Sequence, residues 1–258
     1  MIGMIGFGRF SELMARYLSK DFEIRISTRR DRQKEIREVG AAQVPLEEVC
    51  RMDHVILSVP ISAMKGVLCE IAPLLNPQAT VMDVCSVKEY PVRLMRELLP
   101  ETVSILPTHP MFGPDSAAQS LSGKKIVLCK ERIAEGHYQA IKTYLAAKGL
   151  LILETTPEDH DRQTARSLSL THFIGRTLSQ IKASPLGIDT EGYKRLLHIL
   201  EVVENDTWQL FLDMHAYNAH AKPTRLAFMA AMENIHGQLE EAENTMERSN
   251  KILDNPKN

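Results

Sequence analysis

The most constraining feature of this chain is a glycine-rich turn that directly follows its apolar N-terminal run. The turn covers residues 6–11, and residues 12–17 after it have a helical pattern. A strand, a G-x-G-x-x-G/S turn and a helix in this order are typical of a dinucleotide-binding site. Gly6 permits the tight turn, Gly8 lets backbone N–H groups approach a pyrophosphate, and the helix N-terminus favours negative charge. Ser11 replaces the third glycine, where a small side chain still allows the helix to pack closely on the strand.

The residues after the second predicted strand, 22–26, indicate which dinucleotide is bound. An NAD site usually has an Asp or Glu about 20 residues past the glycines, where it binds the ribose 2′-hydroxyl. This chain has Ser27, Thr28, Arg29 and Arg30 there. Hydroxyls and guanidinium groups suit a 2′-phosphate, so we expect NADP, with NAD as the alternative. The alternative is that these arginines form only a solvated basic turn that binds no ligand.

Strand and helix patterns continue to alternate through the first half of the chain. Such alternation predicts a mostly parallel sheet with right-handed crossovers, which is a doubly wound α/β fold of the Rossmann type. Strand patterns lie at 53–59, 80–84, 103–107, 125–129 and 150–154, and helical patterns at 31–39, 63–75, 87–99 and 134–148.

Unusual polar residues follow two neighbouring strand patterns. Ser86 and Lys88 come after one strand, and His109 comes after the next. Ligands of open α/β sheets bind at the carboxyl ends of the strands, so we expect these side chains to face the nicotinamide half of a cofactor. A histidine exchanges protons near neutral pH, since its ordinary pKa is about 6.5. Ser86 can equally cap the helix that follows it, and His109 can simply occupy a turn.

The alternation stops at Thr156, after which long helical patterns occupy 157–182, 192–219 and 222–252. We therefore expect two domains, a nucleotide-binding domain at 1–155 and an all-helical domain at 156–258. The helical half has more apolar residues than three helices of one chain would bury, which favours a homodimer. Its polar residues His160, Asp161, Arg166, Thr171, His172 and Arg176 could face the cleft, although each alone is more typical of a structural group.

Composition excludes several classes of protein. A net charge of −2 gives no basic surface for nucleic acid or an anionic membrane. No apolar run approaches the roughly 20 residues of a membrane span, and the chain opens on a strand pattern instead of a secretory signal, so we expect a cytoplasmic location. The four cysteines are widely spaced, which predicts neither a metal site nor a disulfide framework.

Several motifs together resemble the prephenate and arogenate dehydrogenases of tyrosine biosynthesis. They lie at residues 6–10, 83–89, 108–114, 160–161 and 171–176, while 190–193 and 217–218 are similar to the short, plant-like arogenate dehydrogenase branch. The resemblance implies NADP-dependent oxidative decarboxylation of prephenate or L-arogenate, giving 4-hydroxyphenylpyruvate or L-tyrosine. Aromatisation of the ring drives this reaction.

The resemblance also implies roles for individual residues. His109 would accept the C4 hydroxyl proton, with Ser86 holding that hydroxyl or the histidine in place. An acid at Asp161 would favour arogenate, whose ammonium it could pair with. The cofactor would contact Gly6, Phe7, Gly8, Arg9, Phe10, Ser27, Thr28, Arg29, Arg30, Ser58, Val59 and Pro60. The substrate would contact Lys88, Met111, Phe112, Gly113, Asp161, His172, Arg176 and His198.

His198 marks a departure from the family pattern, because many members have an arginine there that binds the substrate carboxylate. Basic residues that could substitute for it are Lys194, Arg195, Arg166 and Arg176.

Two other functions compete with this one. A β-hydroxyacid dehydrogenase also has a nucleotide domain followed by helices, but it relies on a lysine base, for which this chain offers only Lys182. A non-catalytic NADP-binding regulator would keep the glycine turn and Arg29. Such a regulator would have no use for Ser86 and His109 at adjacent strand ends.

Overall fold

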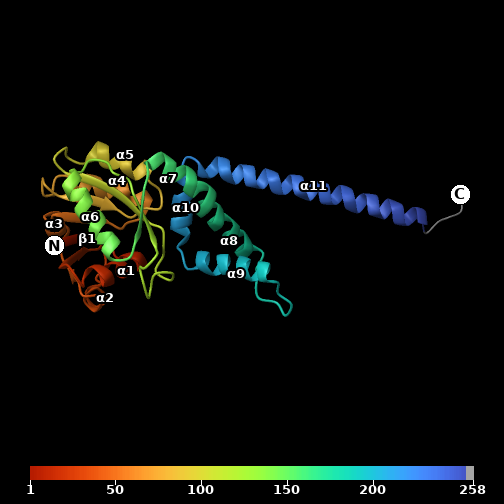
Figure 1. Ribbon diagram of the computed structural model, residues 1–258, viewed down its shortest axis with the longest axis horizontal. Coiled ribbons are helices and arrows are strands. Elements are labelled where there is room, and N and C mark those ends of the chain that lie inside the picture. The colour runs from red at the N-terminus through yellow and green to blue at the C-terminus, as the bar shows by residue number, and fades with distance from the viewer. Residues whose placement is uncertain (254–258) are drawn as a thin grey trace.

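The computed structural model describes residues 1–253, and within them the strands form one eight-stranded sheet with order β3-β2-β1-β4-β5-β6-β7-β8. Helices pack around this sheet and continue beyond it as a helical half (Figure 1). The predicted α/β class is confirmed. The strands are β1 (Ile2–Ile5), β2 (Ile24–Ser27), β3 (Ala42–Gln43), β4 (His54–Leu57), β5 (Thr80–Asp83), β6 (Ser104–Pro110), β7 (Lys125–Leu128) and β8 (Leu151–Glu154).

The chain order places a topological switch point between β1 and β4. The chain builds outward from β1 to β2 and β3, then returns to add β4 on the other side of β1. Strands β1 to β6 are parallel, β6 pairs antiparallel with β7, and β7 is again parallel to β8. Ligands of such sheets bind outside the carboxyl ends of the strands where the order reverses.

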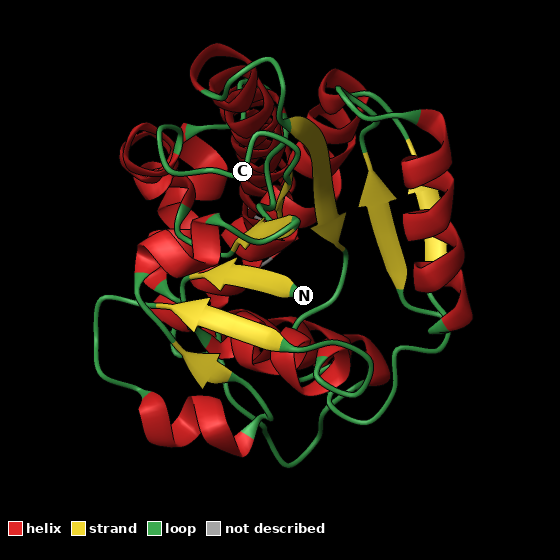
Figure 2. Ribbon diagram, turned by 90° about the vertical axis from the view of Figure 1, so that its left-hand side faces the viewer, coloured by secondary structure: helices red, strands yellow, loops and turns green. Residues whose placement is uncertain are grey.

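The helices of the nucleotide-binding half follow their strands closely. They are α1 (Arg9–Leu18), α2 (Gln33–Glu38), α3 (Leu46–Cys50), the 3-10 turn Ile61–Ala63, α4 (Met64–Ile71), α5 (Glu89–Leu98) and α6 (Glu135–Ala147). The short elements β3 and α3 were not expected from the sequence. Figure 2 shows helices on both faces of the twisted sheet.

The core lies on both faces of the central strands. All four residues of β1 are buried, and neighbours such as Ile26, Val55 and Leu57 are completely enclosed. Burying one such side chain contributes about 1.5–3 kcal/mol. These strands therefore form a rigid base for the loops at their carboxyl ends.

Strand β6 is longer than expected. The pattern predicted a strand ending at Pro107, because turn-forming residues bound the apolar run 103–107. The strand instead runs to Pro110, and Thr108, His109 and Pro110 pair antiparallel with β7. Pro107 contributes its carbonyl, which accepts a bond from the Cys129 N–H (3.0 Å). His109 therefore lies within a paired strand and not in a loop.

The helical half begins with α7 (Pro157–Thr164), a π-helical turn (Ala165–Ser169) and α8 (Leu170–Gln180). One uninterrupted helix was expected here. The second expected helix is also divided, into α9 (Glu191–Glu204) and α10 (Trp208–Ala216), because Thr207 caps a new helix by accepting the Leu210 N–H (3.2 Å).

Helix α11 (Ala221–Leu253) projects away from the rest of the chain (Figure 1). The last sheet strand ends at Glu154 and α7 begins at Pro157, on either side of the predicted domain boundary, which stays a prediction. Residues 254–258, at the end of the predicted second domain, lie outside the described residues.

Among residues 1–253, no helix combines the length and the apolar character needed to cross a membrane.

Candidate active site

The turn after β1 has the geometry that a pyrophosphate requires. Gly6 has φ +98°, and a Cβ atom there would lie 2.2 Å from the Ser58 carbonyl oxygen, so only glycine fits. Nothing lies within 4 Å of the place where a Cβ on Gly8 would be. Gly8 thus leaves open space at the N-terminus of α1, where backbone N–H groups attract an anion. These residues fit a dinucleotide.

Ser11 has a structural role that the missing third glycine did not reveal. Its buried hydroxyl donates to Ser58 Oγ (2.7 Å) and accepts a long bond from the Gly8 N–H (3.4 Å). The Ser58 N–H in turn donates to the Ile5 carbonyl (2.9 Å). Ser11 therefore connects the glycine turn to the end of β4, next to the predicted cofactor residues Val59 and Pro60.

The basic residues after β2 are available for a ligand. Ser27 ends β2, beside β1, and its carbonyl accepts the Gly6 N–H (2.9 Å). Arg29 and Arg30 are exposed, and neither guanidinium has a hydrogen bond or ion pair within the described residues. Arg32 differs, since it pairs with Glu35 (2.8 Å) and lies over the ring of Phe7 (5.7 Å).

Arg9 and Phe10 connect the glycine turn to other parts of the chain. Arg9 donates to the Asp115 carboxylate (2.6 Å) and to the Asn205 carbonyl (2.8 Å), which lies between α9 and α10. The ring of Phe10 lies 6.0 Å from that of Phe112. The cofactor turn therefore contacts both the loop after His109 and the helical half.

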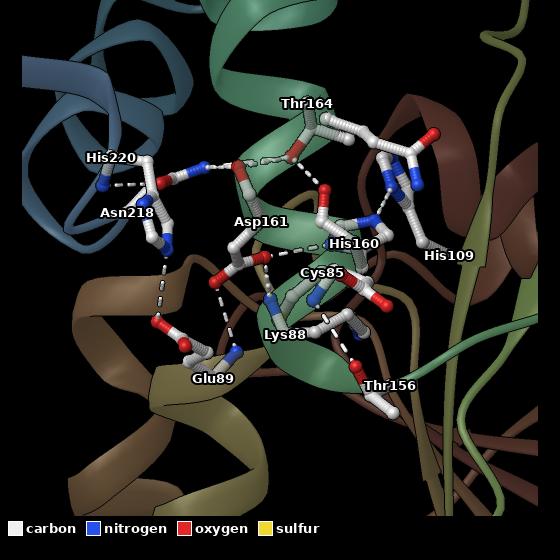
Figure 3. A network of polar contacts seen from close by, with 12 residues as sticks. Cys85, Lys88, Glu89, His109, Thr156, His160, Asp161, Thr164, Asn218 and His220 are labelled. Carbon is white, nitrogen blue, oxygen red and sulfur yellow. Dashed lines mark hydrogen bonds and ion pairs between the residues drawn. The ribbon is translucent and has the colours of Figure 1, made fainter. Parts of the chain in front are cut away.

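His109 is the buried titratable group at the end of β6, with 6% of its surface exposed. Its Nδ1 lies 2.8 Å from Nε2 of His160, on α7 (Figure 3). Burial lowers the pKa of His109 well below its ordinary value of 6.5, and the neighbouring His160 and Lys88 lower it further. His109 is therefore neutral at physiological pH, as a proton acceptor must be.

Asp161 is completely enclosed and faces other protein groups. It accepts the Lys88 N–H (2.7 Å) and the Glu89 N–H (2.9 Å) at the start of α5, and it lies 2.7 Å from Nδ1 of His160. A carboxylate at a helix N-terminus is favourable. The resemblance implied that Asp161 pairs directly with a substrate ammonium. In the structure both oxygens of its carboxylate instead contact protein groups.

Lys88 is also enclosed, contrary to the expected substrate contact. Its ammonium group pairs with the Asp83 carboxylate and donates to the Thr108 carbonyl (2.5 Å). Lys88 therefore connects the ends of β5 and β6, immediately before His109.

Ser86 has an unused hydroxyl. Its Oγ is buried and has no hydrogen-bond partner among the described residues. Because β5 and β6 are neighbours in the sheet, Ser86 and His109 extend from adjacent strand ends. A buried polar atom without a partner is rare, so this oxygen is suited to a ligand.

Two predicted substrate residues, His172 and Arg176, lie together on α8. His172 Nε2 is 3.7 Å from the Asp206 carboxylate, and Arg176 donates to the Asp206 carbonyl (2.6 Å). The Arg176 guanidinium also lies over the rings of Trp208 and Phe211. Burial lowers the pKa of His172 to about 4. His172 Nδ1 and Arg176 Nε are buried without partners among the described residues.

The remaining predicted substrate residues are placed differently. His198 lies on α9 with 75% of its side chain exposed, 3.7 Å from Glu201, so the structure does not bring it to the other site residues. Met111 and Phe112 follow β6 and are partly exposed, and Gly113 has open space around its Cβ position.

His160 is the residue that sequence reasoning undervalued. We expected a structural or surface group in the first turn of a helix, yet it is buried and lies between His109 and Asp161. The adjacent His160 and Asp161 in the sequence were the available signal. No cluster of three metal-ligating side chains occurs in the part of the chain that the structure describes.

Comparison with known proteins places these features in a family. The sequence model of the prephenate dehydrogenase nucleotide-binding domain matches residues 19–151, and that of the TYRAAT1-like C-terminal domain matches residues 177–251. Residues 19–151 therefore belong to a nucleotide-binding domain, and the family resemblance is confirmed.

Curated relatives and solved structures agree with this assignment. Arogenate dehydrogenase 1, chloroplastic, of Arabidopsis thaliana is 30% identical over 249 residues, which cover 92% of this chain and 39% of that protein. Arogenate dehydrogenase 2, chloroplastic, of the same plant is 30% identical over 252 residues, with 92% and 70% covered. This chain thus spans well under half of the first relative.

The structure of prephenate dehydrogenase from A. aeolicus, in complex with hydroxyphenyl propionate and NAD+, has the same fold, with a TM-score of 0.73, 19% identity, and 98% and 95% of the two chains covered. The domain match over more than half of the residues, together with 30% identity along 92% of the sequence, shows that this chain belongs to the prephenate/arogenate dehydrogenase family.

Proposed function

We propose that this chain catalyses the oxidative decarboxylation of prephenate or L-arogenate, giving 4-hydroxyphenylpyruvate or L-tyrosine. The observation that carries the proposal is a buried His109 in β6, next to β5, with the unpartnered Ser86 hydroxyl in the segment that follows β5. Both lie at the edge of the sheet where ligands of this fold bind.

His109 is the proposed general base. The substrate loses hydride from C4, its ring carboxylate leaves as CO2, and the electrons of the broken carbon–carbon bond complete the aromatic ring. His109 accepts the C4 hydroxyl proton as that oxygen gains carbonyl character, which requires a nitrogen without a proton. After CO2 has left and the ring is aromatic, His109 returns the proton to the phenolate oxygen. A bound nicotinamide supplies the hydride acceptor.

Ser86 is proposed to hold the reacting hydroxyl. Its buried Oγ has hydrogen-bonding capacity that no described protein group uses. A hydroxyl can both donate and accept, so it can orient the substrate oxygen toward His109.

His172 and Arg176 are proposed to bind a substrate carboxylate from α8. Each has a buried ring or guanidinium nitrogen without a partner among the described residues. Arg176 is the cation of the pair, because the low pKa of His172 keeps its imidazole neutral. The exposed His198 is the weaker candidate for this role.

NADP is the proposed cofactor, held by two sets of residues. The glycine turn and the start of α1 would bind the pyrophosphate, and the unpaired guanidinium groups of Arg29 and Arg30 would bind a 2′-phosphate. Arginine binds phosphate bidentately, which adds specificity.

A homodimer through α11 is proposed from the exposed apolar face of that helix. Along this face of α11, apolar residues recur at alternating steps of four and three, which is the spacing of a coiled-coil seam. Met232, Ile235, Leu239 and Met246 on this face are each more than half exposed. The seam consists of Phe228, Met232, Ile235, Leu239, Ala242 and Met246.

An absorbance assay at the NADPH band, with prephenate and arogenate as separate substrates, tests the proposed reaction. We expect NADPH formation with at least one of them. No NADPH with either substrate would reject the reaction and favour a non-catalytic NADP-binding protein. The β-hydroxyacid dehydrogenase alternative lacks its base here, because Lys182 is exposed beyond the end of α8.

A further inference from the structure

We infer that His160 is a positioning residue that fixes the ring tautomer of His109, so that His109 presents an unprotonated Nε2 to the substrate. The inference rests on the proposed role of His109 as base. It concerns three groups in a line, which are the Asp161 carboxylate, the His160 ring and the His109 ring (Figure 3).

The bond between Asp161 and His160 determines which ring nitrogen of His160 carries a proton. The carboxylate already accepts the Lys88 and Glu89 N–H groups, one on each oxygen. An ionised carboxylate only accepts hydrogen bonds, so the proton between it and Nδ1 of His160, 2.7 Å away, belongs to the imidazole.

A neutral imidazole donates from one ring nitrogen and accepts at the other. With its proton on Nδ1, His160 has a bare Nε2, which can only accept. That nitrogen lies 2.8 Å from Nδ1 of His109, so His109 must donate from Nδ1. A neutral His109 that donates from Nδ1 has its lone pair on Nε2, at the other side of the ring.

The arrangement is rigid, because the groups come from three elements that meet here. His109 belongs to β6, His160 and Asp161 to α7, and the two N–H donors to the start of α5. The carbonyl of Asp161 also accepts Asn218 Nδ2 (2.8 Å), and the His160 carbonyl accepts the Thr164 hydroxyl (2.9 Å).

The competing protonation pattern has the opposite consequence. If His160 carried protons on both ring nitrogens, it would donate to His109 Nδ1, and a neutral His109 would then keep its proton on Nε2. His109 could not act as base in that state. The other charged groups near the line are Lys88, paired with Asp83, and Glu89, which lies 4.0 Å from His220.

Nitrogen-15 NMR of the histidine rings in the full chain distinguishes these patterns, because protonated and bare ring nitrogens have separate chemical shifts. We expect His109 protonated at Nδ1 and bare at Nε2 in the wild type near neutral pH. A wild-type His109 protonated at Nε2 would overturn the inference.

Two substitutions of His160 test the same point by kinetics. His160→Phe keeps a ring but removes the acceptor, and we expect kcat to fall about 100-fold or more with KM changed less than about threefold. His160→Gln offers Oε1 as an acceptor for His109 Nδ1 and should remain within about tenfold of wild type. Equal losses in both variants, or none in His160→Phe, would contradict a positioning role.

His137→Phe is the matched control. His137 also makes a ring-to-ring contact, with its Nε2 2.9 Å from Nε2 of His54, but His54 begins β4 at the opposite end of the sheet. This variant should keep the wild-type kcat and the His109 tautomer. The NMR measurement needs no turnover, so a chain that is inactive on both substrates yet protonated at His109 Nδ1 would reject the proposed reaction and leave the tautomer in place.

Discussion

Lys88 and Asp83 form an ion pair that is completely buried between the carboxyl ends of β5 and β6. The Thr108 hydroxyl completes the connection by donating to the Asp83 carbonyl (2.6 Å). This cluster holds the backbone immediately before His109. A buried ion pair need not stabilise a fold overall, but removal of one partner leaves the other charge without compensation.

Lys88→Met should therefore lower the free energy of unfolding by about 3–5 kcal/mol. Urea denaturation measures the loss. Lys65→Met, on the exposed side of α4, is the control and should change stability by less than about 0.5 kcal/mol. Similar small effects in both variants would contradict an ionised pair at Lys88.

Gly6→Ala and Gly8→Ala should fail in different ways. At Gly6 the new methyl meets the Ser58 carbonyl, and alanine is strained at the positive φ. We therefore expect the free energy of unfolding to fall by about 1–3 kcal/mol or more. At Gly8 the methyl meets no protein atom within 4 Å, so the melting temperature should hold while the Kd for NADP rises about tenfold or more. Unchanged NADP affinity in Gly8→Ala would place the pyrophosphate elsewhere.

The double variant Arg29→Ala/Arg30→Ala should raise KM for NADP by about 100-fold or more and leave KM for NAD nearly unchanged. Each lost charged hydrogen bond costs about 1.5–3 kcal/mol, and only NADP has the 2′-phosphate. Arg37→Ala, an exposed residue of α2, serves as control. Equal changes for the two cofactors would show that the pair does not read the phosphate.

Leu239→Glu should convert a dimer into a monomer in size-exclusion chromatography with light scattering, because it places a charge in the proposed α11 seam. Asn244 lies on the opposite side of that helix, so Asn244→Glu should leave the dimer intact. A wild-type chain that is already monomeric at micromolar concentration would remove the dimer proposal.

The sequence predicted the sheet well, because local patterns dictate it. The glycine turn, the alternation of strands and helices, and the apolar runs each depend on neighbouring residues. The extension of β6 could not be predicted, because two prolines argue locally against a strand and only the partner β7 shows which carbonyls are used.

The site was predicted in part. The positions of Ser86 and His109 at adjacent strand ends followed from the order of motifs. The burial of Lys88 and Asp161 could not be predicted, because their contact joins residues 73 positions apart. A charged side chain is usually exposed unless a partner encloses it. The same reason concealed the place of His160 between His109 and Asp161.

His109 is proposed to remove the hydroxyl proton, and the kcat of His109→Asn tests this role most directly. With the better of prephenate and arogenate, we predict that kcat falls about 10²–10⁴-fold and that KM changes little, as for the loss of a general base. His137→Asn, which alters a histidine remote from the site, should keep the wild-type kcat. An unchanged kcat in His109→Asn would contradict the account.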